Sequence, residues 1–565
     1  MTAKNPSIEA ATTRRMPFEK YKAFQPIALP DRTWPDQVIT RAPRWCSVDL
    51  RDGNQALIEP MTPAEKLKMY QLLLELGFKE IEVGFPAASQ TDFDFVRLII
   101  EQDMIPDDVT IQVLCQARED LITRTCEAVR GARQVIFHLY NSTSTLQRKV
   151  VFNMTRQQVV QLATDATKMV KAHTDLLQAD GTDVTLEYSP ESYTATEMDF
   201  AVEICDAVMN VWQPTVDKKM ILNLPSTVEM ATPNIYADQL EWFIRHLPQR
   251  DKAVISLHTH NDRGTGVAAS ELGLMAGADR IEGTLFGNGE RTGNCDLITM
   301  AMNMFSQGID PQLYLSDMPK IVEVSEECTK IPIHVRQPYA GELVFTAFSG
   351  SHQDAIRKGM ARVDGTSGVW EVPYLPIDPT DVGGSYRETV RVNSQSGKGG
   401  VAFILESYYG VSLPRPLLLE FSPVIQKLSE GGGELKPETI WQAFVNEFVE
   451  VDGPYKLVDY KVVANGERQV CEARIKVGDN VINIVGEGNG PIDAFIAAMV
   501  ATLNEPLNVI DYQEYALNEG SQAQAICIIA ITDEAQSKFY GVGLSPNTIT
   551  AAFGSIIAAI NRKWR

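Results

Sequence analysis

The chain has 565 residues, and its 51 Lys and Arg against 73 Asp and Glu give a formal net charge of −22. This length exceeds what one hydrophobic core usually organises, so we expect two or three domains. The acidic excess opposes nonspecific binding to nucleic acid or to anionic membranes. An anionic substrate would therefore need a local cluster of positive charge.

Targeting and cysteine patterns favour a cytoplasmic protein. No run approaches the roughly 20 apolar residues of a membrane helix. The N-terminal segment MTAKNPSIEAATTRRMPF lacks the apolar stretch of a signal peptide. The eight cysteines are scattered without a Cys-x-x-Cys pair, which is typical of reduced thiols rather than of a disulfide framework or a zinc ribbon.

Short apolar runs alternate with helical segments from about residue 45 to 290. Each run is rich in Val, Ile, Leu or aromatic residues, as buried parallel strands are. They read WCSVDL, KEIEVG, VTIQVL, QVIFHLY, VTLEYS, KMILNL, AVISLHTH and RIEGTL. Eight such units predict an α/β fold, a (β/α)₈ or TIM barrel. The alternative, a doubly wound open sheet, usually has a Gly-rich turn after its first strand, whereas RDGN stands here.

Four regions are expected along the chain. They are an N-terminal arm at 1–40, the barrel at 41–320, helical linker subdomains at 321–432 and a C-terminal α+β domain at 433–565. Glycine-rich stretches at 394–400 and 428–437 mark the last boundaries.

The C-terminal domain contains a weak internal repeat. Asp459-Tyr460 recurs as Asp511-Tyr512, and the glycine pair Gly486 and Gly488 before Pro491 recurs as Gly541 and Gly543 before Pro546. Each half reads as three strands followed by an apolar helix. Because one such half could hardly bury its own helix, we expect a pseudo-twofold domain.

Potential metal ligands stand where three predicted strands end. His258 and His260 close the seventh strand, Asp52 follows the first beside Arg51, and Asn294 follows the eighth in GNGERTGN. In an α/β barrel the chemistry lies at the C-terminal ends of the strands. Two imidazoles, a carboxylate and an amide suit a divalent ion with open positions for substrate. The alternative for Arg51-Asp52 is a structural ion pair at the barrel mouth.

Other polar residues follow further strands: His138, Ser189, Glu191 and Thr227. His138 is equally consistent with a core histidine. The sequence has no GxxxxGK[ST] motif and no GxGxxG after a strand, so NTP hydrolysis and dinucleotide redox chemistry lack their usual motifs.

Nine segments together resemble the aldolase-type barrel family of acyl-CoA-condensing enzymes, and most closely its isopropylmalate synthase branch. They are DLRDGNQ (49–55), HLYNSTS (138–144), LEYSPESYTATE (186–197), LPSTVEM (224–230), HTHNDRGTG (258–266), GNGERTGN (287–294), SGSHQDAI (350–357), VPYLPIDP (372–379) and NSQSGKGG (393–400). One departure is Asn54, where much of the superfamily has glutamate.

The resemblance implies a Claisen-type condensation of acetyl-CoA with 3-methyl-2-oxobutanoate and water, giving 2-isopropylmalate and CoA in the first committed step toward leucine. It implies a divalent metal, Mg²⁺ or else Mn²⁺ or Zn²⁺, with the ligands Asp52, His258, His260 and Asn294. The implied catalytic residues are Arg51, Glu191, His352 and Tyr374, with the general base open among the last three. The implied substrate-positioning residues are His138, Ser189 and Thr227.

The resemblance also implies a homodimer in which His352 and Tyr374 reach the partner's barrel, and feedback inhibition by leucine. The implied effector residues are Gly488, Asn489, Gly490, Tyr512, Ala516 and Ala523. Three alternatives remain: a sibling condensing enzyme of the citramalate or homocitrate synthase type, a metal-dependent amidohydrolase, and a noncatalytic amino-acid sensor. The amidohydrolase is disfavoured because its His-x-His normally ends strand one.

Overall fold

The computed structural model describes residues 18–363, 368–386, 391–392, 398–430, 434–504, 506–517 and 523–565. The first part of the expected arm and parts of both glycine-rich stretches lie outside these ranges. The chain divides into two compact units, Met1–Val344 and Phe345–Arg565. Among the described residues, no helix has the length and apolar character needed to span a membrane. All eight cysteines are buried free thiols, as the sequence predicts.

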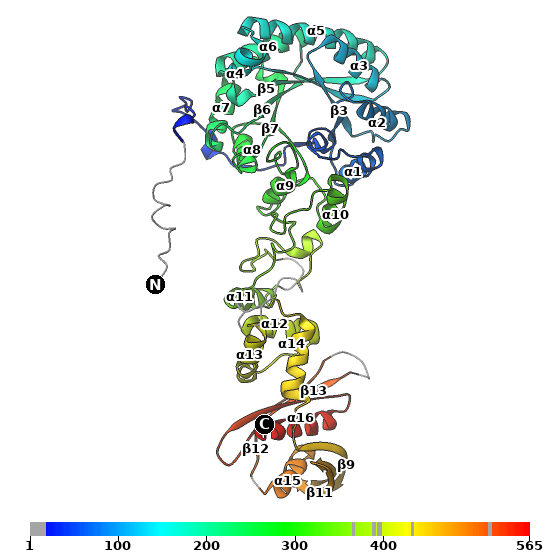
Figure 1. The fold of residues 1–565 in the computed structure, drawn as a ribbon, viewed down its shortest axis with the longest axis vertical. Coiled ribbons are helices and arrows are strands. Elements are labelled where there is room, and N and C mark those ends of the chain that lie inside the picture. Colours follow the sequence, from blue (N-terminus) through cyan, green and yellow to red (C-terminus); the bar gives the residue numbers. More distant parts are fainter. Residues whose placement is uncertain are drawn as a thin grey trace, which may run out of the picture. The chain divides into compact units, whose positions relative to one another are not determined.

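The first unit is a closed barrel of eight parallel strands in chain order, which confirms the predicted fold (Figure 1). Its strands are β1 (Arg44–Ser47), β2 (Glu80–Gly84), β3 (Thr110–Gln116), β4 (Gln134–Ser142), β5 (Asp183–Glu191), β6 (Met220–Ser226), β7 (Ala253–Thr259) and β8 (Arg280–Gly283). The helices of this unit are α1 (Pro63–Glu75), α2 (Gln90–Glu101), α3 (Glu119–Val129), α4 (Thr145–Gln147), α5 (Arg156–Ala179), α6 (Met198–Trp212), α7 (Pro233–His246), α8 (Gly266–Met275), α9 (Leu297–Phe305) and α10 (Met318–Thr329).

Local sequence signals explain where α1 begins and where the chain turns back into β2. The Thr62 hydroxyl accepts the N–H of Glu65, the Glu65 carboxylate accepts the N–H of Thr62, and Pro63 occupies the first helical position. Gly77 then adopts a φ of +93°, a conformation that favours glycine.

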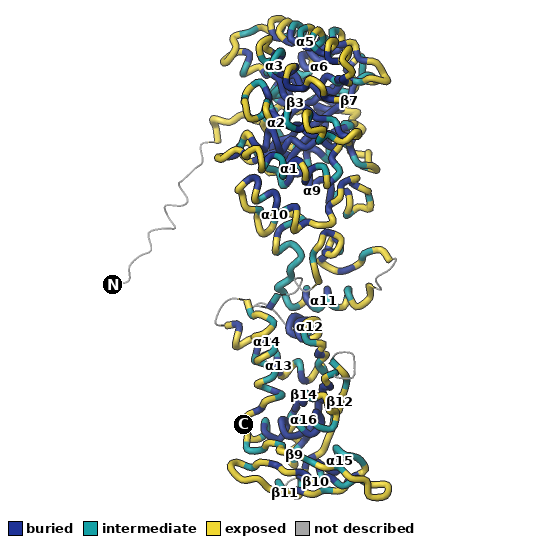
Figure 2. The backbone as a smooth tube through the Cα atoms, turned by 90° about the vertical axis from the view of Figure 1, so that its right-hand side faces the viewer, coloured by how far each residue is buried: buried dark blue, intermediate teal, exposed yellow. Residues whose placement is uncertain are grey.

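The barrel interior holds charged side chains where branched apolar residues are usual. Strands β3 and β7 lie in the buried centre of this unit (Figure 2). Arg280 on β8 is fully buried and forms ion pairs with Glu80, Glu187 and Glu282. Because a buried charge is costly unless it is paired, each member of this network depends on the others.

In the described residues of the second unit, α-helices precede two three-stranded antiparallel sheets, each of which is followed by a helix. The helices are α11 (Gly350–Met360), α12 (Lys398–Tyr409), α13 (Arg415–Ser429) and α14 (Pro437–Phe444). The remaining elements are β9 (Tyr455–Asn465), β10 (Arg468–Val477), β11 (Asn480–Gly488), α15 (Pro491–Leu503), β12 (Asn508–Ala516), β13 (Ala525–Thr532), β14 (Lys538–Ser545) and α16 (Thr548–Lys563).

The two β-β-β-α halves confirm the predicted repeat, with a shift in its glycine correspondence. Tyr460 and Tyr512 occupy equivalent rungs of their sheets. A Cβ on Gly486 would lie 2.2 Å from the Ala494 carbonyl oxygen, and a Cβ on Gly543 would lie 1.8 Å from that of Ala551. Gly486 therefore matches Gly543, not Gly541, and both let a helix backbone approach a strand.

Candidate active site

One pocket of about 640 Å³ collects the barrel residues singled out by the sequence. The predicted residues that line it are Arg51, Asp52, His138, Ser189, Glu191, Thr227, His258 and His260. Apolar side chains of Leu114, Tyr140 and Pro225 line it as well. The pocket therefore combines cations, carboxylates and an apolar wall.

Asp52 reaches the pocket from a turn and not from a strand end. The first strand stops at Ser47, and Asp49–Gly53 forms a π-helical turn in which three N–H groups donate to the Val48 carbonyl. His138, Ser189 and Glu191 also differ from expectation, because they lie within β4 and β5 and not after them. Thr227 follows β6 as predicted.

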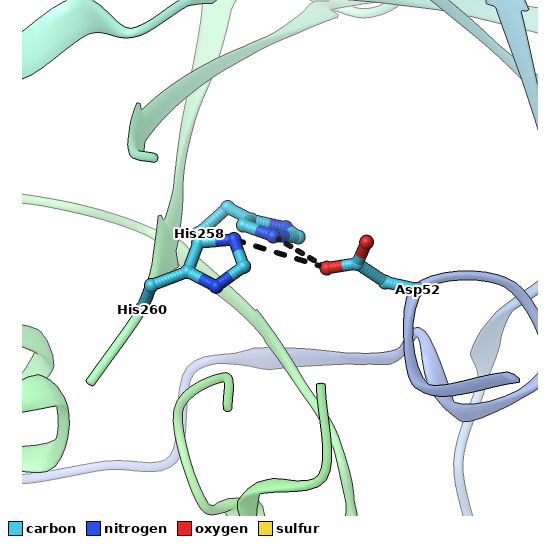
Figure 3. A group of neighbouring side chains, drawn as sticks. All are labelled: Asp52, His258 and His260. Atoms are coloured by element: carbon cyan, nitrogen blue, oxygen red, sulfur yellow. Dashed lines mark hydrogen bonds and ion pairs between the residues drawn. The ribbon is translucent and has the colours of Figure 1, made fainter. Parts of the chain in front are cut away.

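Asp52, His258 and His260 face one another at the barrel mouth (Figure 3). The Asp52 Oδ2 atom lies 3.1 Å from Nε2 of His258 and 3.9 Å from Nε2 of His260. All three side chains are buried, and their potential ligand atoms lie within 4.8 Å of one another. This arrangement could hold a divalent ion.

Unsatisfied polar atoms beside these three residues also fit a bound cation. The Asn294 Nδ2 donates to Asp52 Oδ2 at 2.7 Å, while Asn294 Oδ1 is buried without a hydrogen-bond partner among the described residues. Rotation of the amide by half a turn would present this oxygen to an ion next to Asp52. Asn294 thus suits the role of a fourth ligand.

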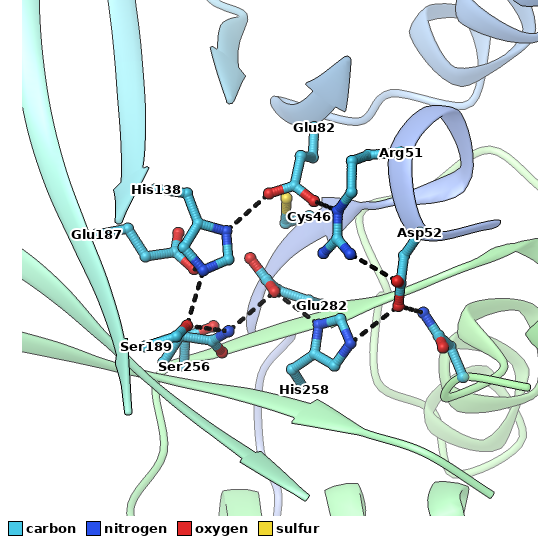
Figure 4. Close-up of polar contacts among 12 residues, drawn as sticks. Cys46, Arg51, Asp52, Glu82, His138, Glu187, Ser189, Ser256, His258 and Glu282 are labelled. Carbon is cyan, nitrogen blue, oxygen red and sulfur yellow. Dashed lines mark hydrogen bonds and ion pairs between the residues drawn. The ribbon is translucent and has the colours of Figure 1, made fainter. Parts of the chain in front are cut away.

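Outer side chains hold the potential ligands in place (Figure 4). Arg51 donates to Asp52 Oδ1 at 2.5 Å and forms an ion pair with Glu82. His258 Nδ1 lies 2.9 Å from Glu282 Oε2, which leaves Nε2 directed at Asp52. A carboxylate behind a histidine is the usual way in which proteins orient a metal-binding imidazole.

The same contacts separate the pKa values of the three residues in the metal-free protein. Burial raises the pKa of Asp52, but Arg51 and His258 outweigh burial and hold the pKa well below its ordinary value. Burial lowers the pKa of His258, yet the hydrogen bonds to Asp52 and Glu282 outweigh it and raise the pKa to about 9. Burial and the neighbouring His258 lower the pKa of His260 to about 4.

We therefore predict a pH-dependent contribution of His258 to the stability of the metal-free protein. Because its pKa is about 9 in the folded state against 6.5 as reference, the stabilisation is complete below pH 6.5 and is lost as the pH rises through 9. The difference in free energy of unfolding between the chelator-treated wild type and His258→Gln should shrink between pH 6 and 10. Urea titrations that give a constant difference over this range would contradict it.

His138 belongs to the polar network beside the pocket and is not an isolated core histidine. Its Nδ1 lies 2.7 Å from Glu82 Oε2, and its Nε2 lies 2.7 Å from the Ser189 hydroxyl. The neighbouring Glu187 has neither carboxylate oxygen hydrogen-bonded within the described part of the chain. Burial and the Glu282 carboxylate raise the pKa of Glu187 well above its ordinary value.

Glu191 and Thr227 are held at the pocket rim by neighbouring loops. The Ser142 hydroxyl donates to the Glu191 carboxylate, and the Thr227 hydroxyl accepts the N–H of Ser192 at 2.9 Å. Glu191 is therefore a carboxylate presented to the pocket by β5.

His352 and Tyr374 belong to the second unit, where their rings stack with centroids 3.9 Å apart. Tyr374 is 60% exposed and has a φ of +66°, in the left-handed region that residues other than glycine rarely adopt. The two side chains thus form a pair of adjacent proton-bearing rings, with Tyr374 exposed and His352 partly buried.

The residues expected to bind an effector lie on two segments of the second unit. Gly488, Asn489 and Gly490 form the turn from β11 into α15, while Tyr512 and Ala516 lie on β12 and Ala523 precedes β13. Gly488 has a structural reason of its own, since a Cβ there would lie 2.4 Å from the backbone N of Ala494.

Sequence reasoning missed the carboxylates behind the site. Glu82, Glu187 and Glu282 are fully buried and contact His138 or His258. The sequence did contain a signal for them, because each of the runs KEIEVG, VTLEYS and RIEGTL has a glutamate inside a predicted buried strand. A charged residue on a buried strand requires a partner.

Comparison with known families covers most of the chain in three consecutive matches. Residues 42–324 match the HMGL-like family, and residues 342–406 match the alpha-isopropylmalate synthase post-catalytic domain. Residues 434–564 match the LeuA allosteric (dimerisation) domain.

Curated relatives match over nearly the full length. The chain is 55% identical over 550 residues to the 2-isopropylmalate synthase of Rhodospirillum rubrum, covering 96% of this chain and 98% of that protein. It is 54% identical over 557 residues to that of a Parafrankia species, covering 97% and 98%. It is 52% identical over 555 residues to that of Clostridium acetobutylicum, covering 97% and 99%.

Proposed function

The chain belongs to the 2-isopropylmalate synthase family, and we propose that its barrel pocket carries out the corresponding condensation. The reaction joins acetyl-CoA, 3-methyl-2-oxobutanoate and water to give 2-isopropylmalate and CoA. The observation that carries the assignment to this pocket is the convergence of eight of the nine candidate barrel residues on one cavity, while the ninth, Asn294, contacts Asp52.

Asp52, His258, His260 and Asn294 would hold a divalent ion, with Mg²⁺ as the first choice. When bound, such an ion polarises the ketone of a chelating 2-oxo acid and favours attack on it. Arg51 pairs with Asp52 and would offset the negative charge that develops on the ketone oxygen of the oxo acid.

His138, Ser189 and Thr227 would position the oxo acid. The Ser189 hydroxyl is fixed by His138 and by the Asn223 amide, which donates to it at 3.1 Å. Apolar walls at Leu114 and Pro225 suit the branched carbon chain of 3-methyl-2-oxobutanoate.

Glu191, His352 and Tyr374 would transfer protons. Glu191 is the carboxylate in the barrel pocket, and a base is required to take a proton from the acetyl methyl group. His352 and Tyr374 would come from the partner subunit of a homodimer, which agrees with the match of residues 434–564 to a dimerisation domain.

The decisive assay measures thiol release from acetyl-CoA with a panel of 2-oxo acids after chelation and addition of Mg²⁺, Mn²⁺ or Zn²⁺. We expect the highest kcat/KM with 3-methyl-2-oxobutanoate and little turnover with pyruvate or 2-oxoglutarate. A preference for either of the latter acids would replace the assignment with a sibling condensing enzyme.

The second unit would bind leucine as a feedback inhibitor. Val509, Ile510 and Tyr512 expose 38%, 49% and 43% of their surface on β12, whereas the β9 residues Tyr460 and Val462 pack against the core. The start of α15 at Gly490 has no side-chain cap, and a Cβ there would meet open space. The Asp493 carboxylate accepts the N–H of Asn489 at this end of the helix. An apolar strand beside a helix N-terminus whose N-cap residue has no side chain suits an amino acid with an apolar side chain and a carboxylate.

We predict that Tyr512→Ala raises the leucine concentration for half-maximal inhibition by about tenfold or more, because aromatic contacts dominate small binding surfaces. Condensation rates over a leucine series give the value. Tyr460→Phe at the equivalent rung is the matched control, since its ring contact with Phe553 is retained. An equal response of both variants would remove Tyr512 from the effector site.

A further inference from the structure

A charged cluster at the pocket rim joins the loops that follow β6, β7 and β8. Arg291 Nε donates to Asp262 Oδ1 at 2.7 Å, and Arg291 Nη2 donates to the carbonyl oxygen of Thr227. Asp262 Oδ2 in turn accepts the backbone N–H of Glu229 at 3.1 Å. One guanidinium therefore connects all three loops.

Glu229 ties two of these loops together a second time. Its side chain is buried, and its carboxylate accepts the N–H of Arg263 and the hydroxyl of Thr265 at 2.5 Å. Charged acceptors make stronger hydrogen bonds than neutral ones, and burial excludes competing water. Hydrogen bonds to the buried Glu229 carboxylate thus link the loops after β6 and β7.

The loop that carries Arg291 is held in an unusual conformation. Arg291 has a φ of +58°, which costs free energy for a residue with a Cβ. Gly293 has a φ of +99°, and a Cβ there would lie 1.9 Å from the Gly287 carbonyl oxygen. Such a conformation persists only where surrounding contacts enforce it.

The joined loops carry residues of the candidate site. Thr227 lies on the first loop, His260 immediately precedes the second, and Asn294 lies on the third. His260 and Asn294 also form a backbone bridge, so the second and third loops share one frame. Arg291 is the side chain of these loops that contacts Thr227 itself, through the Thr227 carbonyl oxygen. The contacts of Asp262 and Glu229 join the same loop to that frame two residues further along the chain.

We propose that Arg291 is a positioning residue for the 2-oxo acid. It holds Thr227 in a fixed place relative to His260 and Asn294, so that the two ends of a chelating oxo acid meet their partners together. This role rests on the proposed condensation. Arg291 acts through Thr227 and Asp262 and is not itself a catalytic residue.

The test compares Arg291→Gln with Arg250→Gln. Arg250 is a close match, because it also bridges a carboxylate, Asp279, and two carbonyl oxygens, those of Ala253 and Gly277, but at the opposite end of β7. A small displacement of a binding group is enough to cost a large factor in rate. Arg291→Gln should lower kcat/KM for the oxo acid by about ten- to a hundredfold through KM, with KM for acetyl-CoA within about twofold.

Hydrogen exchange on the metal-free protein tests, without turnover, the contacts that Arg291 and Asp262 make between the loops, which we call the brace. Hydrogen exchange of the amides in 227–229 and 261–265 should accelerate in Arg291→Gln and Asp262→Asn, and the double variant should show no further change. Arg291→Lys keeps the charge but not the forked geometry, so it should recover only part of the oxo-acid KM.

The proposal is overturned if Arg291→Gln behaves like Arg250→Gln in both oxo-acid KM and loop exchange. It is also overturned if the loops loosen while the oxo-acid KM stays at the wild-type value. Absence of condensation by the wild type with every oxo acid would instead refute the proposed function, and the exchange data would still report on the brace.

Discussion

Replacing Asp52 with asparagine should lower kcat/KM for the condensation by about a thousandfold or more. The change is isosteric, so it removes charge and leaves the shape of the pocket. Asp52 is the only carboxylate of the ligand trio, and it also compensates Arg51 and His258 inside a buried site. The affinity of the chelator-treated protein for the divalent ion, measured by titration calorimetry, should also be lower in Asp52→Asn than in the wild type.

Asp199→Asn is the matched control, because that carboxylate pairs with Arg156 on the surface, with 70% of its side chain exposed. Its kinetics should stay within about twofold of the wild type. If Asp52→Asn kept activity within tenfold of the wild type at saturating metal, Asp52 would not be a ligand, and Arg51-Asp52 would return to being a structural pair.

Replacing Arg280 with methionine should lower the free energy of unfolding of the barrel by about 3–5 kcal/mol. Methionine keeps most of the volume but leaves Glu187 and Glu282 without their arginine partner in the barrel interior. It also removes donors to Gln112 and Ser256. Urea titration followed by hydrogen exchange of barrel peptides separates this unit from the rest of the chain.

Arg133→Met provides the comparison, since Arg133 pairs with Asp103 at a site where its side chain is 59% exposed. Such surface pairs contribute about 0–1 kcal/mol. A loss of less than about 1 kcal/mol in Arg280→Met would mean that the barrel carboxylates take up protons instead of remaining charged.

The barrel could be predicted from the sequence because its strands differ so clearly from the intervening helices. The rule that barrel chemistry lies at strand ends then predicts from the sequence alone that Asp52, His258 and Asn294 lie together. The rule was less reliable for His138 and Ser189, which lie inside strands, because a sequence pattern fixes strand ends only within a few residues.

The side-chain network behind the site could not be derived in the same way. Glu82 contacts both Arg51 and His138, and these contacts depend on the stagger of neighbouring strands around the closed sheet. The brace formed by Asp262 and Arg291 likewise requires a left-handed backbone conformation at Arg291, which the local sequence does not predict. In the second unit, the equivalence of Gly486 and Gly543 between the two halves of the repeat follows from how the helices pack on the sheets. The repeated residues alone do not specify this packing.

The candidate ligands come from the turn after β1, from β7 and from the loop after β8, and β1 pairs with β8 to close the barrel. Asp52 and His258 stand 206 positions apart in the chain. These groups meet only when β1 has paired with β8 and β8 with β7, which joins the two ends of the barrel sequence through contacts of high sequence separation. An ion that binds there requires both ends of the barrel sequence to be paired, so it stabilises the closed form by mass action.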